Sequence, residues 1–288
     1  MELSNKVVLT AALTGAVTPK SINEDIPTTP EEISEAAYKV WQAGASVVHF
    51  HMRDDEGLGT MDKDRFKKTL DLLKGNHPDC DVVINCTTAG DSRATDDERM
   101  AHLALVRPEI ASYDAGSLNW TPDGVFVNSP SFLEKLGSTM KELGIKPEFE
   151  IFDAGMMGNV AYYASKGVLV APYHYQFVLG VLGGMPATVE SLVYLKNLLP
   201  DEATWSAFGI GRDHQKIMYA ALALGGHIRV GLEDNVYYAR GVKATNVSLV
   251  ERAARVIKEF GKEVATPADA RQILSLPAKA ATIEATLA

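Results

Sequence analysis

Hydrophobic positions along the chain follow two patterns that alternate from start to end. Short continuous apolar runs, such as 7–12, are typical of strands buried on both faces. Longer segments with apolar residues three or four positions apart, such as Ile33, Ala37 and Val40, are typical of amphipathic helices. We predict strands at 7–12, 46–51, 81–87, 110–114, 148–153, 174–179, 204–210 and 227–232. We predict helices at about 29–43, 62–74, 96–106, 131–143, 158–166, 188–199, 215–224 and 248–261.

Eight strand–helix units in succession, with no linker between them, predict a (β/α)8 TIM barrel. The chain of 288 residues is then one domain, 1–288, with a short tail from about 266. An open doubly wound sheet is the alternative. The turn after the first strand, 14–17, has a single glycine, so it lacks the glycine-rich dinucleotide signature of that alternative.

Composition narrows the class of protein further. Hydrophobic residues make up 46% and charged residues 23% of the chain, which excludes a disordered or fibrous protein. The net charge of −9 argues against nucleic acid or an anionic membrane as partner. Two cysteines cannot form a disulfide framework, and we find no membrane span. We therefore expect a cytoplasmic location.

Polar residues gather where the second and eighth strands end. His49 and His51, two positions apart, point to the same face of a strand, and this is half of a zinc or iron site. Arg229, Glu233 and Asp234 close the eighth strand, one strand removed from the histidines in a closed barrel. A His2Glu set with an open position is a catalytic zinc site. Hydrogen-bonded core histidines and a structural salt-bridge network are the alternatives.

Other strand ends add weaker candidates. Thr87 and Gly90 follow the third strand and Ser112 lies on the fourth, where hydroxyls and an amide can hold a carboxylate. Glu148 and Glu150 share one face of the fifth strand, and charges facing a barrel interior need partners.

Three further features carry weaker signals. The turn 209–212, of sequence GIGR, can offer amides and a guanidinium to a phosphate, although a tight strand–helix turn explains it as well. Cys86 is expected to be buried and not a nucleophile. We expect His77 and His102 at the surface.

Long stretches of the chain resemble the β-keto acid cleavage enzymes, whose best-known type is the 3-keto-5-aminohexanoate cleavage enzyme. The similarity is in the runs LTAALTGA, VVHFHMRDDEG, TTAG, PEIASYDAGSLNW, PEFEIFDAGM, QFVLGVLGGMP, FGIGR and GGHIRVGLEDN. The resemblance extends over essentially the whole chain, from about 7 to 274.

The resemblance implies a TIM barrel with a divalent metal, usually zinc, on His49, His51 and Glu233. It implies that a β-keto acid and acetyl-CoA give acetoacetate and the CoA ester of the shortened acid. Asp234 then matches the family's base and Arg229 its positioning arginine. Glu148 or Glu150 falls in an acidic motif, and Thr87, Gly90 and Ser112 match substrate-holding positions. A homo-oligomer, a tetramer, is also implied.

One position departs from this resemblance. The type that cleaves an amino acid has a glutamate where this chain has Val17, so the usual anchor for a substrate ammonium is missing. We therefore expect a substrate without a primary amine on its tail. Asp213 is a second candidate to read a cationic tail, although it can also cap the next helix. A zinc-dependent aldolase or hydrolase without CoA, and a non-catalytic metal sensor, are the competing functions.

Overall fold

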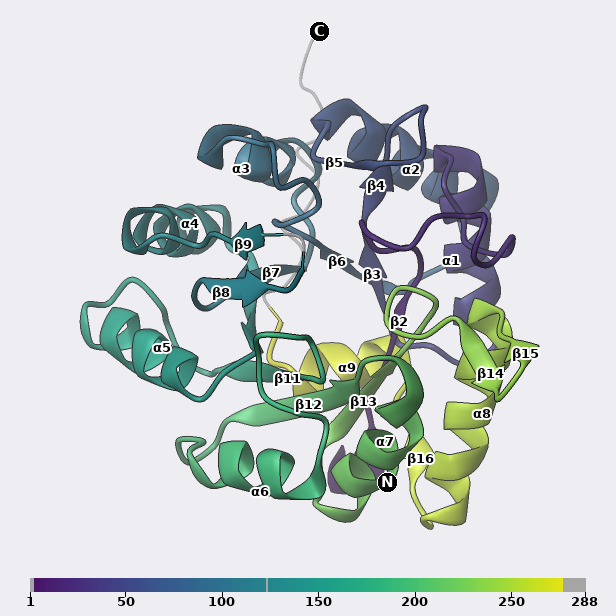
Figure 1. The fold of residues 1–288 in the computed structure, drawn as a ribbon. Helices are drawn as coiled ribbons and strands as arrows, with labels where there is room; N and C mark the ends of the chain where they lie inside the picture. The colour runs from purple at the N-terminus through teal and green to yellow at the C-terminus, as the bar shows by residue number, and fades with distance from the viewer. Residues whose placement is uncertain (1–2, 123, 277–288) are drawn as a thin grey trace, which may run out of the picture.

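Eight parallel strands close into a barrel in a computed structural model that describes residues 3–122 and 124–276 (Figure 1). The strands are β2 (Leu9–Ala12), β3 (Val47–Phe50), β6 (Val83–Cys86), β7 (Ile110–Asp114), β10 (Lys146–Ile151), β11 (His174–Leu179), β12 (Thr204–Gly209) and β13 (His227–Val230). They pair in chain order, and β13 pairs with β2 to close the ring. The predicted TIM barrel is therefore confirmed.

A ring of helices surrounds the barrel, one after each strand (Figure 1). They are α1 (Pro30–Gln42), α2 (Lys63–Asn76), α3 (Asp96–Val106), α4 (Pro130–Leu143), α5 (Gly155–Ser165), α6 (Val189–Asn197), α7 (His214–Ala223) and α8 (Asn246–Glu259). Local chemistry fixes where several begin. Thr29 and Glu32 form a capping box ahead of Pro30 at the start of α1, and Thr95 and Glu98 do the same for α3.

Several predicted ends shift by a few residues, and at two places the local reason is clear. The predicted strand 148–153 ends at Ile151, because the Asp153 side chain accepts a hydrogen bond from the Gly155 amide and starts α5 three residues early. The predicted strand 227–232 ends at Val230. The next residue, Gly231, has φ +151°, and a Cβ there would lie 1.9 Å from the Ala12 carbonyl oxygen.

The N-terminal end of the barrel is closed by the two ends of the described chain. After the 3-10 turn Leu3–Asn5, β1 (Lys6–Val7) pairs with β16 (Glu263–Val264), and α9 (Pro267–Ile273) follows. Ala270 and Leu274 pack against the first inward-facing layer of the barrel, which is formed by Val8, Val47, Val83 and Ile110. Part of the predicted tail is thus an ordered plug, and residues 277–288 lie outside the described residues.

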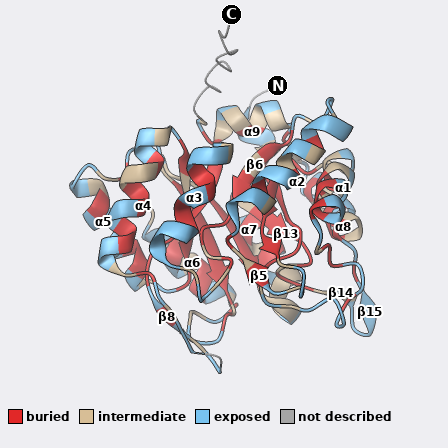
Figure 2. Cartoon of the chain, turned by 90° about the horizontal axis from the view of Figure 1, so that it is seen from above, coloured by how far each residue is buried: buried red, intermediate tan, exposed pale blue. Residues whose placement is uncertain are grey.

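Three small hairpins, none of them predicted, stand on the opposite end of the barrel from α9 (Figure 2). They are β4 (Met52–Arg53) with β5 (Gly59–Thr60), β8 (Leu118–Trp120) with β9 (Gly124–Phe126), and β14 (Tyr237–Ala239) with β15 (Val242–Lys243). A 3-10 turn, Gly211–Asp213, precedes α7. Figure 2 shows the barrel strands buried inside the helices. The β14–β15 hairpin is largely exposed, whereas β4 is buried. Among the described residues, no helix is both long and apolar enough to cross a bilayer.

Candidate active site

The two histidines of β3 meet a glutamate that follows β13. His49 Nε2 lies 3.7 Å and His51 Nε2 3.4 Å from Glu233 Oε1. The order β13–β2–β3 brings these strand ends together, because β2 is the single strand between them. The structure therefore places the three predicted metal ligands in one cluster.

Two glycines allow this close approach. Gly15 has φ +60°, and a Cβ there would lie 2.7 Å from the Glu233 Cγ. A Cβ on Gly90 would lie 2.9 Å from Met61 Sδ and 3.4 Å from His51 Nδ1. Gly90, predicted to contact substrate, thus lies directly against a histidine of the cluster.

Arg229 is a buried cation that holds three carboxylates. Its Nε and Nη2 donate to the two oxygens of Asp234, both at 2.9 Å. Nη2 also donates to Glu233 Oε1 at 2.5 Å, and Nη1 lies 3.6 Å from Glu150 Oε1. The guanidinium covers the Phe208 ring at 4.3 Å. Burial lowers the pKa of Arg229, but its carboxylate partners outweigh burial and raise that pKa well above its usual value.

The carboxyl groups around Arg229 differ in their affinity for a proton. Burial favours the protonated form of Glu233, but His51, Arg229 and His49 outweigh it and hold its pKa well below the usual value. For Asp234 burial outweighs the attraction of Arg229, and its pKa rises to about 6. Burial and the facing Asp114 raise the pKa of Glu150 well above the usual value. Neighbouring carboxyl groups are therefore prepared for different roles.

The donor atoms of the cluster fit a divalent metal ion. Glu233 Oε2 and the Nδ1 atoms of both histidines are buried without a hydrogen-bond partner among the described residues. Burial lowers the pKa of His49 to about 4, which keeps its ring neutral, as a metal ligand must be. The ligand atoms of His49, His51 and Glu233 lie within 4.8 Å of one another, and two imidazoles with one carboxylate are a catalytic zinc set.

A second group, His49 with Glu148 and Glu150, is also close enough to hold a metal. Glu148, however, already has partners. Asn85 Nδ2 donates to its Oε1 at 2.7 Å, and His174 Nε2 lies 3.6 Å from its Oε2. Glu148 therefore sits in a polar layer beneath the metal cluster, which the sequence signals only by polar residues at inward strand positions.

The predicted substrate hydroxyls have defined partners. Thr87 Oγ1 accepts from the Ala89 amide at 3.0 Å, and Ser112 Oγ accepts from the Thr88 amide at 3.0 Å. Both side chains are buried and shape the turn after β6. Each hydroxyl still has its own proton to donate to a carboxylate.

The remaining candidates fall into two groups. Val17 is 65% exposed in the loop after β2, close in sequence to Gly15. The Asp213 carboxylate is engaged by Lys216 at 2.7 Å and by Arg212 at 3.6 Å. Cys86 is fully buried, and burial raises the pKa of its thiol, as expected of a thiol that is not a nucleophile.

The prediction that His102 lies at the surface is wrong. Its ring is fully buried and stacks on Phe66 with centroids 4.1 Å apart. His102 lies on the face of α3 that packs inward, where its imidazole ring packs as a core aromatic side chain does. His77 is half-buried, stacks on Tyr38 and contacts Glu35.

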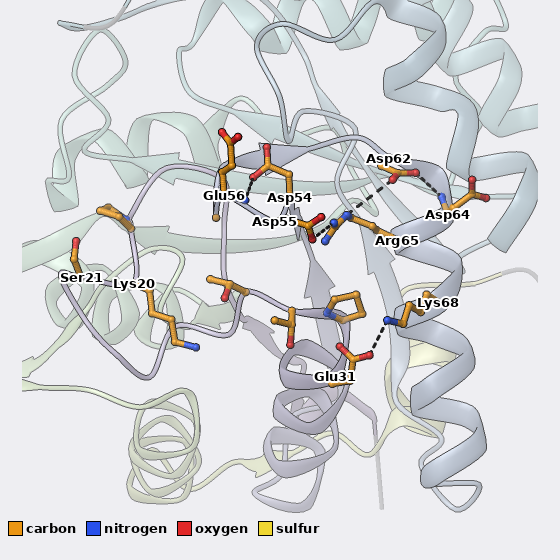
Figure 3. A pocket seen from close by; sticks show the side chains of 15 residues that line it. Lys20, Ser21, Glu31, Asp54, Asp55, Glu56, Asp62, Asp64, Arg65 and Lys68 are labelled. Atoms are coloured by element: carbon orange, nitrogen blue, oxygen red, sulfur yellow. Dashed lines mark hydrogen bonds and ion pairs between the residues drawn. The ribbon is translucent and has the colours of Figure 1, made fainter.

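A cavity of about 770 Å³ lies at the outer rim, beside the metal cluster's loops (Figure 3). The loop after β2, the β4–β5 hairpin and the starts of α1 and α2 line it. Its lining includes six carboxylates and the three cations Lys20, Arg65 and Lys68. Each of these cations pairs with a carboxylate. None of the predicted site residues is among the described residues that line this cavity.

A TIM barrel with a His2Glu cluster, a buried arginine and a second carboxylate at one mouth has the groups of an enzyme site that can hold a metal ion and accept a proton. The family model of the beta-keto acid cleavage enzymes matches residues 6–276, and the chain belongs to this family.

Individual relatives agree with this assignment. The chain is 42% identical to a 3-keto-5-aminohexanoate cleavage enzyme of Fusobacterium nucleatum, over 95% of this chain and 99% of the relative. It is 35% identical to a 3-dehydrocarnitine:acetyl-CoA trimethylamine transferase of Rhizobium meliloti, over 96% and 98%. The solved binary complex of ObcA with oxaloacetate superposes with a TM-score of 0.77 at 22% identity, covering 88% of this chain and 68% of that one. The last likeness supports the fold alone.

Proposed function

We propose that this enzyme cleaves a β-keto acid with acetyl-CoA, giving acetoacetate and the CoA ester of the shortened acid. The observation that supports this most directly is the cluster of His49, His51 and Glu233 beside the Arg229–Asp234 pair, in a chain of this family. The first three residues would hold a divalent ion, for which we propose zinc. When bound, that ion would act as a Lewis acid on the ketone oxygen.

Asp234 is the proposed base. A carboxyl group whose pKa is about 6 can accept a proton near neutral pH, when its carboxylate form predominates. Each Asp234 oxygen accepts one N–H from Arg229 and keeps a further lone pair for the proton on the carbon between ketone and carboxylate. Arg229 fixes the direction of these lone pairs and stabilises the anion.

After the proton is removed, carbon–carbon bond formation, CoA transfer and cleavage complete the proposed reaction. The carbanion attacks the thioester carbonyl of acetyl-CoA, and the CoA sulfur moves to the substrate's keto carbon. The bond between that carbon and the former carbanion carbon breaks, and Asp234 returns its proton to the acetoacetate formed. Thr87, Gly90 and Ser112 are proposed to hold the substrate carboxylate, and Glu148 is proposed to hold the polar layer beneath His49.

Three finer predictions accompany this proposal. We propose that 1–288 form one catalytic domain, that the protein works in the cytoplasm, and that it is a homo-oligomer of the tetrameric kind. Exposed large apolar side chains, Leu182 and Tyr194 among them, offer surface for a subunit contact.

An assay of a small panel of β-keto acids, with and without acetyl-CoA, tests the reaction itself. We expect acetoacetate and a new CoA ester in equal amounts, and no turnover when acetyl-CoA is left out. Cleavage or hydrolysis at the same rate without acetyl-CoA would support an aldolase or hydrolase instead.

Asp234→Asn tests the base. We expect at least about a hundredfold loss of kcat, the usual scale of general-base catalysis, with the bound metal retained. Asp97→Asn, which removes an exposed carboxylate on α3, is the matched control and should behave as wild type. A kcat for Asp234→Asn close to that of wild type would mean that another carboxyl group is the base, and Glu150 would be the first to test.

Val17→Glu tests the tail specificity. Valine cannot neutralise an ammonium, so wild type should prefer a β-keto acid without a primary amine. An ion pair at this exposed position is worth about 1 kcal/mol, so the kcat/KM ratio of amino to neutral substrate should rise about fivefold. Val17→Gln, similar in size but uncharged, should leave the ratio unmoved. A wild type that already prefers the amino substrate contradicts the assignment.

A further inference from the structure

The rim beside the metal cluster is basic although the protein is acidic. Residues 209–259 contain eight Lys or Arg against five Asp or Glu, whereas the whole chain has a net charge of −9. This segment supplies α7, the β14–β15 hairpin and α8, which lie next to one another around the end of β13 (Figure 1). Three exposed cations of this segment, Arg240, Lys243 and Arg255, lie on the turn and strands of the β14–β15 hairpin and on α8, in the part of the barrel that follows β13, where barrels commonly bind phosphate.

Arg252 on α8 is a buried cation without a counter-ion. It is 7% exposed, and its guanidinium lies 3.5 Å from the centre of the Tyr238 ring. Its Nε and Nη2 have no hydrogen-bond partner, and no carboxylate among the described residues lies within ion-pair distance. A buried charge is costly unless it is paired, so this arginine is suited to a ligand that brings negative charge.

His214, the first residue of α7, connects Arg252 to that helix's N-terminus. Two donors face its Nε2, namely Arg252 Nη1 at 3.4 Å and Asn235 Nδ2 at 3.3 Å. Its Nδ1 lies 2.8 Å from the Gly211 carbonyl oxygen. These neighbours assign a neutral ring that donates from Nδ1 and accepts at Nε2. Arg252 thus contacts the first residue of α7, a helix whose positive end has no side-chain cap.

Exposed cations lie on the same elements as Arg252 and its stacking partner Tyr238. Arg255 Nη2 donates to the Tyr238 hydroxyl at 3.1 Å, and Arg240 and Lys243 are exposed on the β14–β15 hairpin and its turn. The nearby Asp213 is already engaged by Lys216 and Arg212. The rim is also close to the reaction centre, because Asn235, which contacts His214, follows Asp234 directly.

We propose that this basic rim, consisting of Arg240, Lys243, Arg252, Arg255 and the start of α7, binds the phosphate groups of acetyl-CoA. The inference rests on the proposed function, which supplies the co-substrate. CoA carries a diphosphate and a 3′-phosphate at the opposite end from its thioester. When the thioester is at the reaction centre, these phosphates therefore need an anion site at the edge of the barrel mouth. The cavity of Figure 3 does not offer this, because its carboxylates outnumber its cations and every cation is paired.

Titration calorimetry of the metal-loaded enzyme with CoA, dephospho-CoA and pantetheine tests the site without turnover. Wild type should bind CoA more tightly than dephospho-CoA, and pantetheine more weakly than either. Arg252→Gln should weaken CoA binding by at least about tenfold, the loss expected for a charged hydrogen-bonded contact. It should leave pantetheine binding unchanged. In steady state the KM for acetyl-CoA should rise by the same factor, while the KM for the keto acid and kcat stay within about twofold.

Because Arg252 is buried, the double variant Lys243→Gln/Arg255→Gln repeats the test at exposed positions, where the fold tolerates the change. Arg65→Gln and Lys68→Gln, cations of the Figure 3 cavity, are the matched controls and should bind CoA as wild type does. Unchanged CoA affinity in both rim variants, or a loss confined to the two controls, overturns the phosphate site. A loss of CoA affinity in the rim variants of an enzyme that turns over no β-keto acid supports the site and contradicts the proposed function instead.

Discussion

The structure of the site depends on one buried cation. Arg229 is 4% exposed and is surrounded by Asp234, Glu233 and Glu150. Removing one member of a buried ionic group leaves an uncompensated charge, at a cost of about 3–5 kcal/mol. This constraint fixes the two adjacent carboxylates relative to each other. Glu233 reaches the histidines of β3, whereas Asp234 stays bidentate on the arginine.

The different contacts of Glu233 and Asp234 explain how two adjacent carboxylates can perform different chemistry. Glu233 faces three groups that favour its charged form, so it is ready to be a metal ligand. Asp234 faces one cation and strong burial, so it can exchange a proton near neutral pH. Gly15 makes the arrangement sterically possible, because any side chain there would overlap Glu233. The barrel closure of β13 on β2 then sets the distance to His49 and His51.

The apolar pattern was enough to predict the eight units, since each strand is a short run buried on both faces and each helix buries one face at helical spacing. It missed what depends on contacts distant in sequence. The position of α9 at the barrel end depends on the pairing of β1 with β16. The three hairpins depend on tertiary packing. In the β4–β5 hairpin, for example, Arg53 donates hydrogen bonds to the carbonyl oxygens of Gly15 and Thr14. The metal cluster was predictable because strand ends converge in a barrel. Three features could not be predicted, because a single sequence shows residue types and not neighbours. They are the partners of Glu148, the pairing of Asp114 with Glu150, and the burial of His102.

Anomalous diffraction at the zinc edge from crystals of the zinc-loaded enzyme tests most directly whether Arg229 separates the two carboxylates. A single peak in contact with one ring nitrogen each of His49 and His51 and an oxygen of Glu233 is predicted, with both Asp234 oxygens still on Arg229. A peak coordinated by Asp234, or one placed between His49, Glu148 and Glu150, would contradict the account.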